Sequence, residues 1–150
     1  MSEAIIVTVL VENSVQAPGL MAEHGLAFHV HTGSESFLFD TGQSGLVAQN
    51  ARHLGVDLSR IGAVALSHGH YDHTGGLRAV WDLAPEAGLF AHPSVLVPRF
   101  ARNPDGSTRE VGLSAQSRDA IEAHGGVLVG DLARLQVELA RIRTTRRKTR

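Results

Sequence analysis

The sequence predicts a mixed α/β domain built from packed layers. Its 150 residues fit one domain that is large enough to bury a core. The proportions of 43% hydrophobic and 19% charged residues are typical of a soluble globular protein. Short apolar runs typical of strands alternate along the chain with segments of helical spacing, and this alternation is the pattern of an α/β arrangement.

The first third of the chain predicts three strands. The first is a β-branched apolar run, typical of a well-buried strand, and the second alternates between apolar and polar residues with a period of two. Turn residues precede the third run, so we expect a hairpin between the second and third strands. Asp40 ends the third run, which places a carboxylate at a strand tip. The expected strands are residues 5–11, 26–32 and 37–39.

The remaining chain predicts helices between further strands. The helices end where Gly55, Pro85 and Gly125 follow, because these residue types cap or stop helices. Residues 93–112 contain three prolines and are expected to be mostly irregular. Residues 132–142 fit either a strand or a helix face. The expected helices are residues 46–54, 77–84 and 116–124, and the expected strands are residues 61–66, 89–91 and 127–129.

The stretch from Ser67 to His73, the histidine loop, carries the chemistry. It follows an expected strand directly, and glycines flank it. Four potential metal ligands lie within it: His68, His70, Asp72 and His73. Because the chain has no cysteine, a zinc site must use imidazole and carboxylate, which zinc accepts. We expect Gly69 to let the backbone turn so that the rings on either side of it point the same way. The adjacent Asp72 and His73 are expected to diverge toward a second metal position. Solvated loop histidines are the alternative.

The complete pattern His-x-His-x-Asp-His after a strand resembles the signature of the metallo-β-lactamase superfamily. The segment from Leu38 to Gly42 is similar to that superfamily's aspartate motif at a strand tip. Four segments are similar to one subgroup, often labelled dihydropterin-methyl-aminobenzene-ribofuranosyl-phosphate synthase-like. These segments are residues 9–13, 23–26, 39–45 and 66–77, and the resemblance as a whole covers roughly residues 4 to 145.

The resemblance implies a role for each residue of the motif. His68 and His70 would bind a first metal, Asp72 and His73 a second, and Asp40 would fix the orientation of a ligand. The cofactor would be one or two Zn²⁺ ions, with Mn²⁺ or Fe as alternatives. The implied reaction is hydrolysis of a small-molecule substrate, or a related group transfer, by a metal-activated water. Asp72 would be the catalytic group that orients this water or accepts its proton.

The implied fold is the N-terminal part of a four-layer αββα sandwich, with residues 1–145 as an incomplete domain and 146–150 as a basic tail. The superfamily completes its site with two further histidines and a bridging acid downstream. After the histidine loop only His92 and His124 remain, and neither stands in a motif resembling those ligands. We therefore expect the chain to be truncated or shifted out of frame near Thr145. The alternative function is a catalytically incomplete fragment that binds metal weakly and needs a partner chain or a longer parent.

The charge is distributed unevenly along the chain. Before residue 134 there are 7 basic and 14 acidic residues, whereas the remainder has 7 basic and 1 acidic. This basic end lacks aromatic residues for base stacking, so a solvated tail is favoured over a nucleic-acid arm.

The first apolar run is too short to span a bilayer and lacks a basic leader, so we expect no membrane partner and a cytoplasmic location. Half a sandwich would expose one apolar sheet face, and we expect either a homodimer through that face or poor folding of the chain.

The other histidines are expected to have structural roles. His92 is interpreted as structural or substrate-facing, and His124 as a helix cap whose ring suits the helix dipole. The remainder are expected on the surface or in packing contacts: His24, His29, His31 and His53. Among them His24 is expected to come nearest the histidine loop, because its turn resembles the family.

Overall fold

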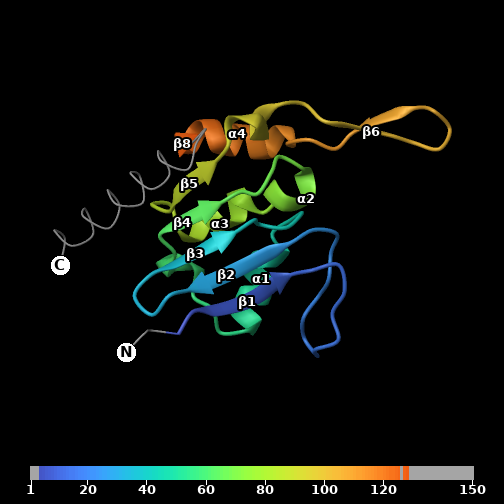
Figure 1. Ribbon diagram of the computed structural model, residues 1–150. Coiled ribbons are helices and arrows are strands. Elements are labelled where there is room, and N and C mark those ends of the chain that lie inside the picture. Colours follow the sequence, from blue (N-terminus) through green and yellow to red (C-terminus); the bar gives the residue numbers. More distant parts are fainter. Residues whose placement is uncertain (1–3, 126, 129–150) are drawn as a thin grey trace.

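The computed structural model describes residues 4–125, 127 and 128 (Figure 1). These residues form strands, α-helices and two short 3-10 helices, η1 and η2. In chain order the elements are β1 (Ile6–Val11), β2 (Ala27–His31), β3 (Ser36–Phe39), α1 (Leu46–His53), η1 (Leu58–Arg60), β4 (Ala63–Ala65), α2 (Tyr71–Thr74), α3 (Leu77–Leu83), β5 (Gly88–Ala91), η2 (Pro93–Leu96), β6 (Phe100–Arg102), β7 (Thr108–Glu110), α4 (Ala115–His124) and β8 (Val127–Leu128).

The main sheet has six strands in the order β1-β2-β3-β4-β5-β8. The pairs β1–β2 and β2–β3 are antiparallel, and the expected hairpin joins β2 to β3. The pairs β3–β4, β4–β5 and β5–β8 are parallel, and helices make the crossovers that parallel neighbours need. The predicted mixed α/β class is therefore confirmed.

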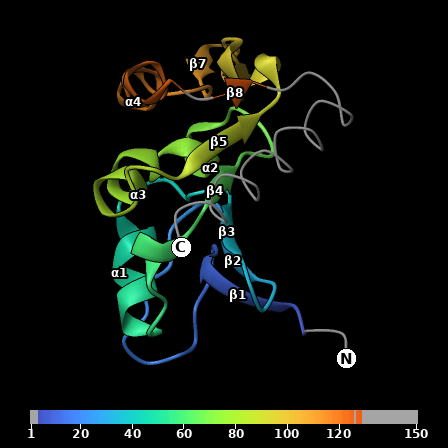
Figure 2. The ribbon, with the colours of Figure 1, turned by 90° about the vertical axis from the view of Figure 1, so that its left-hand side faces the viewer.

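Helices α1, α3 and α4 lie on one side of the main sheet (Figure 2). Under them the sheet presents Leu38, Val64 and Leu89, all of which are fully buried. The strand pairing places these three side chains on the same face, since residues in register project to the same side. The helix-covered face therefore forms the main core and fixes the strand ends that carry the candidate site.

The opposite face of the sheet, the open face, is apolar, and no helix in the part of the chain that the structure describes covers it. Its β1 end is exposed, whereas Ala63 and Phe90 on β4 and β5 are buried in a small second cluster with Phe37 and Ala65 packed against them. The strand register places these residues on the open face: Val7, Val9, Phe28, Val30, Phe37, Phe39, Ala63, Ala65 and Phe90. Val7 is 56% exposed and Val9 48%. The prediction of a well-buried first strand is therefore wrong for most of β1, in which only Leu10 and Val11 are buried. An apolar run predicts a strand, but its own sequence does not show whether another part of the chain packs over that strand.

Two further predictions need correction. The segment expected to be irregular contains η2 and the hairpin β6–β7, in which Phe100 pairs with Glu110 (Figure 1). Charged and polar residues make up β7, so they did not give a strand pattern. The histidine loop, expected as a loop throughout, contains the short helix α2. The ambiguous residues 132–142 and the proposed boundary at residue 145 lie outside the described residues.

None of the helices in the described part of the chain is long and apolar enough to cross a bilayer.

Candidate metal centre

The candidate site lies at the edge of the main sheet where β3 and β4 both end. Asp40 follows β3 directly, and the histidine loop begins after β4. Because β3 and β4 are parallel, their carboxyl ends meet at the same edge. The backbone NH of Asp40 donates to the carbonyl of Ala65 at 2.8 Å, which ties the two strand ends together. The sheet topology therefore brings the two sequence motifs into contact.

The histidine loop changes from extended chain to helix at His70. That residue is extended, and the single turn of α2 begins with Tyr71. The turn is closed by a hydrogen bond from the backbone NH of His73 to the carbonyl of His70 at 3.1 Å. The carbonyl of His73 accepts two hydrogen bonds from Thr41, one from its NH and one from its hydroxyl. The turn folds the second half of the loop back toward the first, so the donor side chains come together.

Asp40 organises the side chains of the loop. It is fully buried, and its carboxylate accepts hydrogen bonds from the backbone NH of Ser67 at 2.8 Å and from the Ser67 hydroxyl at 2.6 Å. Its Oδ2 also lies 2.7 Å from Nδ1 of His73. Because a carboxylate has no hydrogen to donate, the ring hydrogen lies on Nδ1, and Nε2 of His73 keeps its free lone pair. Asp40 has φ of 59°, a strained conformation of the kind that clusters at functional sites.

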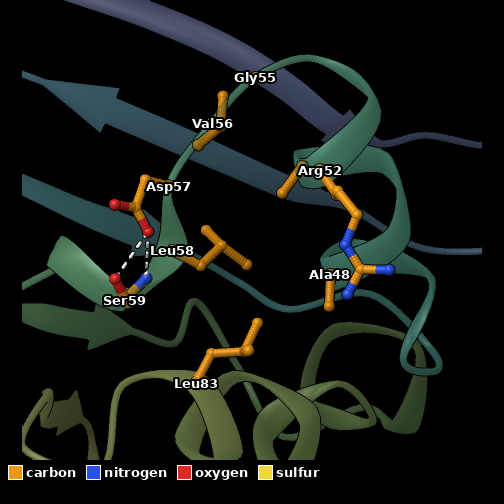
Figure 3. A pocket seen from close by; sticks show the side chains of 9 residues that line it. Ala48, Arg52, Gly55, Val56, Asp57, Leu58, Ser59 and Leu83 are labelled. Atoms are coloured by element: carbon orange, nitrogen blue, oxygen red, sulfur yellow. Dashed lines mark hydrogen bonds between the residues drawn. The ribbon is translucent and has the colours of Figure 1, made fainter.

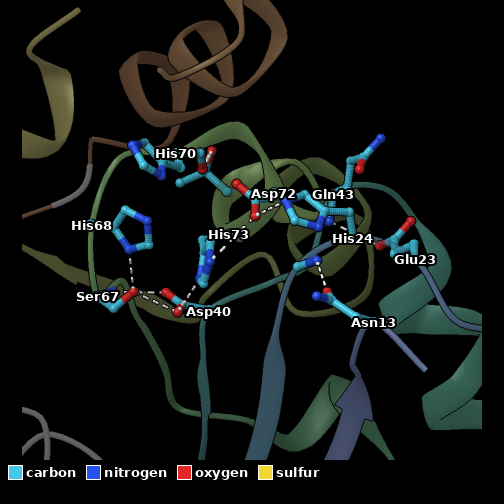
Figure 4. Close-up of polar contacts among 12 residues, drawn as sticks. Asn13, Glu23, His24, Asp40, Gln43, Ser67, His68, His70, Asp72 and His73 are labelled. Carbon is cyan, nitrogen blue, oxygen red and sulfur yellow. Dashed lines mark hydrogen bonds and ion pairs between the residues drawn. The ribbon is translucent and has the colours of Figure 1, made fainter. Parts of the chain in front are cut away.

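The rings of the three loop histidines lie close together (Figure 4). The ring centroid of His68 is 4.4 Å from that of His70 and 4.2 Å from that of His73. The Ser67 hydroxyl lies 2.8 Å from Nδ1 of His68 and so helps to orient that ring. Partial burial lowers the pKa of His68 below its usual value, and the rings of His73 and His70 lower it further, since adjacent positive charges repel. A neutral imidazole is the form that binds a metal.

The acid of the loop lies between two histidines. Asp72 is 7% exposed, and its Oδ2 is 3.6 Å from Nε2 of His73. On its other side Oδ2 is 3.3 Å from Nε2 of His24, which projects from the β1–β2 connection (Figure 4). The expectation that His24 comes nearest the histidine loop is confirmed. Asp72 and His73 do not diverge as predicted, because the turn of α2 and the bond to Asp40 hold His73 beside His68.

Gly69 has a reason for being glycine that differs from the predicted one. Its φ is not positive, so no left-handed turn requires it. Instead, a Cβ at this position would lie 2.1 Å from the carbonyl oxygen of Val95. The first residues after β5 pack directly on the loop, and only a residue without a side chain leaves room for them.

The donor set fits zinc in its chemistry, but the described residues do not form a finished metal site. Among residues 4–125, 127 and 128, no three His, Asp or Glu side chains already surround one point as an ion requires. Three imidazoles and one carboxylate are nevertheless within reach of one another, and these are donor types that zinc accepts.

The remaining histidines have structural contacts. His92 accepts a hydrogen bond from the backbone NH of Ser94 and caps η2, as the structural interpretation expects. His124 stacks on Trp81 with centroids 4.1 Å apart, and its Nε2 lies 3.1 Å from the Pro85 carbonyl oxygen. His124 lies in the last turn of α4, as the sequence predicts, but Gly125 is the C-terminal cap of the helix and the His124 ring contacts Pro85 instead.

A cavity of about 310 Å³ lies away from the histidine loop, between the end of α1, η1 and α3 (Figure 3). Its charged lining residues are Arg52 and Asp57. The carboxylate of Asp57 accepts hydrogen bonds from the hydroxyl and the backbone NH of Ser59, and these bonds lower the pKa of Asp57. No group of metal-ligating residues lines this cavity among the described residues, so we place the candidate chemistry at the histidine loop.

Known proteins show similarity to this chain in both sequence and structure. A protein of Methanocaldococcus jannaschii named 7,8-dihydropterin-6-methyl-4-(beta-D-ribofuranosyl)-aminobenzene-5'-phosphate synthase is 33% identical over 90 residues, covering 56% of this chain and 31% of the relative. An uncharacterized protein of the same organism is 26% identical over 115 residues, covering 76% of this chain and 43% of the relative. The chain thus spans less than half the length of these curated relatives.

Solved structures of metallo-beta-lactamases also match. Rm3 metallo-beta-lactamase has 25% identity and a TM-score of 0.45, covering 56% of this chain and 35% of that one. The metallo-beta-lactamase SMB-1, bound to 2-mercaptoethanesulfonate, has 27% identity and a TM-score of 0.44, covering 60% and 38%.

The family itself is decided by the sequence. The model of the Metallo-beta-lactamase superfamily matches residues 22–96, which is half of the chain. This range contains the strand-tip Asp40, the whole histidine loop and the turn that carries His24. These are the residues that the structure brings together at one edge of the sheet, and on this match the chain belongs to the metallo-beta-lactamase superfamily.

Proposed function

We propose that this chain carries the zinc site of a hydrolase, or of a related group-transfer enzyme, acting on a small-molecule substrate. The observation that carries the proposal is the orientation of the loop donors: Asp40 holds Nδ1 of His73 and leaves Nε2 free, while Ser67 orients His68. His68, His70, Asp72 and His73 would hold the metal. The contacts of Asp40 and Ser67 therefore orient the rings of His73 and His68 before any ligand arrives.

Bound zinc would lower the pKa of a water molecule toward ~7 and polarise a carbonyl or phosphoryl oxygen of the substrate. The chain's own residues would do the remaining work. The carboxylate of Asp72 would orient the attacking water or take up its proton, because it is the acid closest to the free Nε2 atom of His73. Its low exposure limits competition from bulk water. One similar protein is named a synthase, which is the reason for keeping group transfer beside hydrolysis.

The test is metal-dependent turnover by the purified protein. We expect hydrolysis of an activated phosphodiester or ester when zinc or manganese is supplied, and loss of that activity in Asp72→Asn. His31→Ala is the matched control, since it removes an imidazole away from the loop and should retain activity. Absence of bound zinc together with absence of activity would overturn the proposal.

A second candidate function is favoured by the open face. We propose that two copies of this chain pair through this face and that the isolated chain is catalytically incomplete. Phe39 and Val9 lie on this face and are more exposed than core residues, and burial of apolar surface drives association. Light scattering after size exclusion should then show a dimer that Phe39→Lys converts to monomer. A monodisperse wild-type monomer that does not bind a hydrophobic dye would exclude this candidate.

A further inference from the structure

The Asp72 carboxylate is shared by two imidazoles, and one of them comes from outside the loop motif. Its Oδ2 is 3.3 Å from Nε2 of His24 and 3.6 Å from Nε2 of His73. His24 lies 48 positions before Asp72, so the fold and not the local sequence creates this contact. The Asp72 oxygen therefore has an imidazole nitrogen on each side, although in the described part of the chain these three atoms do not yet surround one point as a bound ion requires.

These separations match those between ligands around a small metal ion. Zinc bound at 2.0–2.1 Å in tetrahedral geometry spaces its ligand atoms about 3.3 Å apart. The separation between His24 and Asp72 equals this value, and the separation between His73 and Asp72 is slightly longer. To share one ion, the two rings would have to shift so that both nitrogen atoms and the Asp72 oxygen face the same point. The His24 side chain is 63% exposed, so its ring can rotate without disturbing the core.

The turn that carries His24 is fixed against the site by its two neighbours. Gly25 has φ of 130°, and a Cβ on it would lie 2.0 Å from the Asp72 carbonyl oxygen, so the backbones meet directly there. The NH of Gly25 donates to Oδ1 of Asn13 at 2.9 Å. The carboxylate of Glu23 accepts from the NH of Gln43 at 2.9 Å and from the NH and hydroxyl of the next residue. The turn is therefore held against both the histidine loop and the segment after Asp40.

We propose that His24 is a metal ligand, binding through Nε2 beside Asp72 and His73. This inference rests on the proposed function, because it requires the histidine loop to bind a metal. Downstream histidines are the ligands that the family resemblance implies, whereas His24 lies upstream of the motif. The simpler interpretation is a hydrogen bond from His24 that positions Asp72 without touching the ion.

Cobalt(II) binding separates these two roles, since the visible absorption of the bound ion reports its ligands directly. For His24→Ala we expect cobalt affinity at the site to fall by more than about 100-fold, beyond the range for loss of an orienting partner, and the absorption band to change. His24→Gln is the decisive second variant. Its amide NH can still donate to Asp72, so a positioning role would be rescued, whereas an imidazole ligand would not. Circular dichroism verifies that both variants fold.

The double variant His29→Ala/His31→Ala is the matched control. These two rings lie parallel on β2 with centroids 6.5 Å apart, away from the loop, and removing them deletes two imidazoles that could bind cobalt nonspecifically. We expect this variant to keep the wild-type absorption band and affinity.

The outcomes distinguish failure of the ligand role of His24 from failure of metal binding by the histidine loop. If wild-type protein shows a cobalt band that His68→Ala abolishes, while His24→Ala or His24→Gln keeps that band unchanged, the ligand role of His24 is wrong and the metal site stands. If wild-type protein binds no cobalt or zinc, the proposed function fails and this inference fails with it. A band that changes in both His24 variants but not in the control supports the ligand role.

Discussion

Asp40→Asn tests whether the buried carboxylate sets the donor state of His73. The substitution keeps the shape of the side chain, and asparagine tolerates the positive φ of 59° at this position. The amide oxygen can still accept from the NH of Ser67. Its NH₂ group would then face the Ser67 hydroxyl and Nδ1 of His73. Because the amide NH₂ group is a donor, Nδ1 of His73 must accept a hydrogen bond from it. The ring hydrogen of His73 then moves to Nε2 and blocks the nitrogen that would bind the metal.

The size of the effect follows from the three contacts at 2.8, 2.6 and 2.7 Å that the Asp40 carboxylate makes. A hydrogen bond to a charged group contributes about 1 kcal/mol more than a neutral one, so the free energy of unfolding should fall by about 2–3 kcal/mol. Loss of a partner that orients a ligand lowers metal affinity by about 10–100-fold. The variant should therefore fold and yet bind zinc weakly.

The assay is a zinc titration against a chromogenic chelator, with urea unfolding of the metal-free protein measured in parallel. Asp57→Asn is the matched control, because Asp57 also accepts two hydrogen bonds from a serine but lies at the start of η1, away from the loop. The control should keep the wild-type zinc affinity. If Asp40→Asn changes zinc affinity by less than about threefold while lowering stability, the carboxylate is structural and our reasoning about His73 is wrong.

Three further predictions concern packing and pH. Gly69→Ala should lower the free energy of unfolding by about 2–3 kcal/mol, because its Cβ would meet the Val95 carbonyl oxygen at 2.1 Å; an unchanged thermal midpoint would contradict this. Asn50→Ala should cost about 2–3 kcal/mol in urea unfolding, since this buried amide bonds the backbone of Leu10 in β1 and of Met21 in the β1–β2 connection; a loss below about 0.5 kcal/mol would refute it. Burial and the adjacent His31 lower the pKa of His29, so the unfolded chain protonates first as pH falls and stability declines below about pH 6.5. His29→Gln should make that decline shallower, and an unchanged pH dependence of the urea midpoint would contradict the assignment.

Local sequence predicts the candidate site well where its parts are contiguous. The histidine loop and Asp40 each follow an apolar strand run, and parallel pairing of those strands brings them together. The contact of His24 with Asp72 depends on the path of a long connection, so local spacing could not give its distance. The sequence predicts a special role for Gly69, but its physical cause is close packing, because the carbonyl that crowds it belongs to a segment 26 positions later.

The burial of β1 and the elements β7 and α2 could not be predicted from local sequence patterns. The apolar residues of β1 predict a strand correctly, but whether Val7 becomes buried depends on a second layer that the strand's own sequence does not describe. The strand β7 pairs through its backbone while its residues, Thr108 to Glu110, are polar and exposed, so hydrophobic alternation could not reveal it. The four-residue helix α2 is too short to show helical periodicity.

X-ray absorption at the zinc edge, measured on protein loaded with one equivalent of zinc, tests the central claim most directly. We predict a first shell of nitrogen and oxygen atoms at about 2.0–2.1 Å with the outer-shell scattering of imidazole rings, and loss of stoichiometric zinc binding in His68→Ala. A zinc shell without imidazole scattering, or zinc content that His68→Ala leaves unchanged, would show that the histidine loop is not a metal centre.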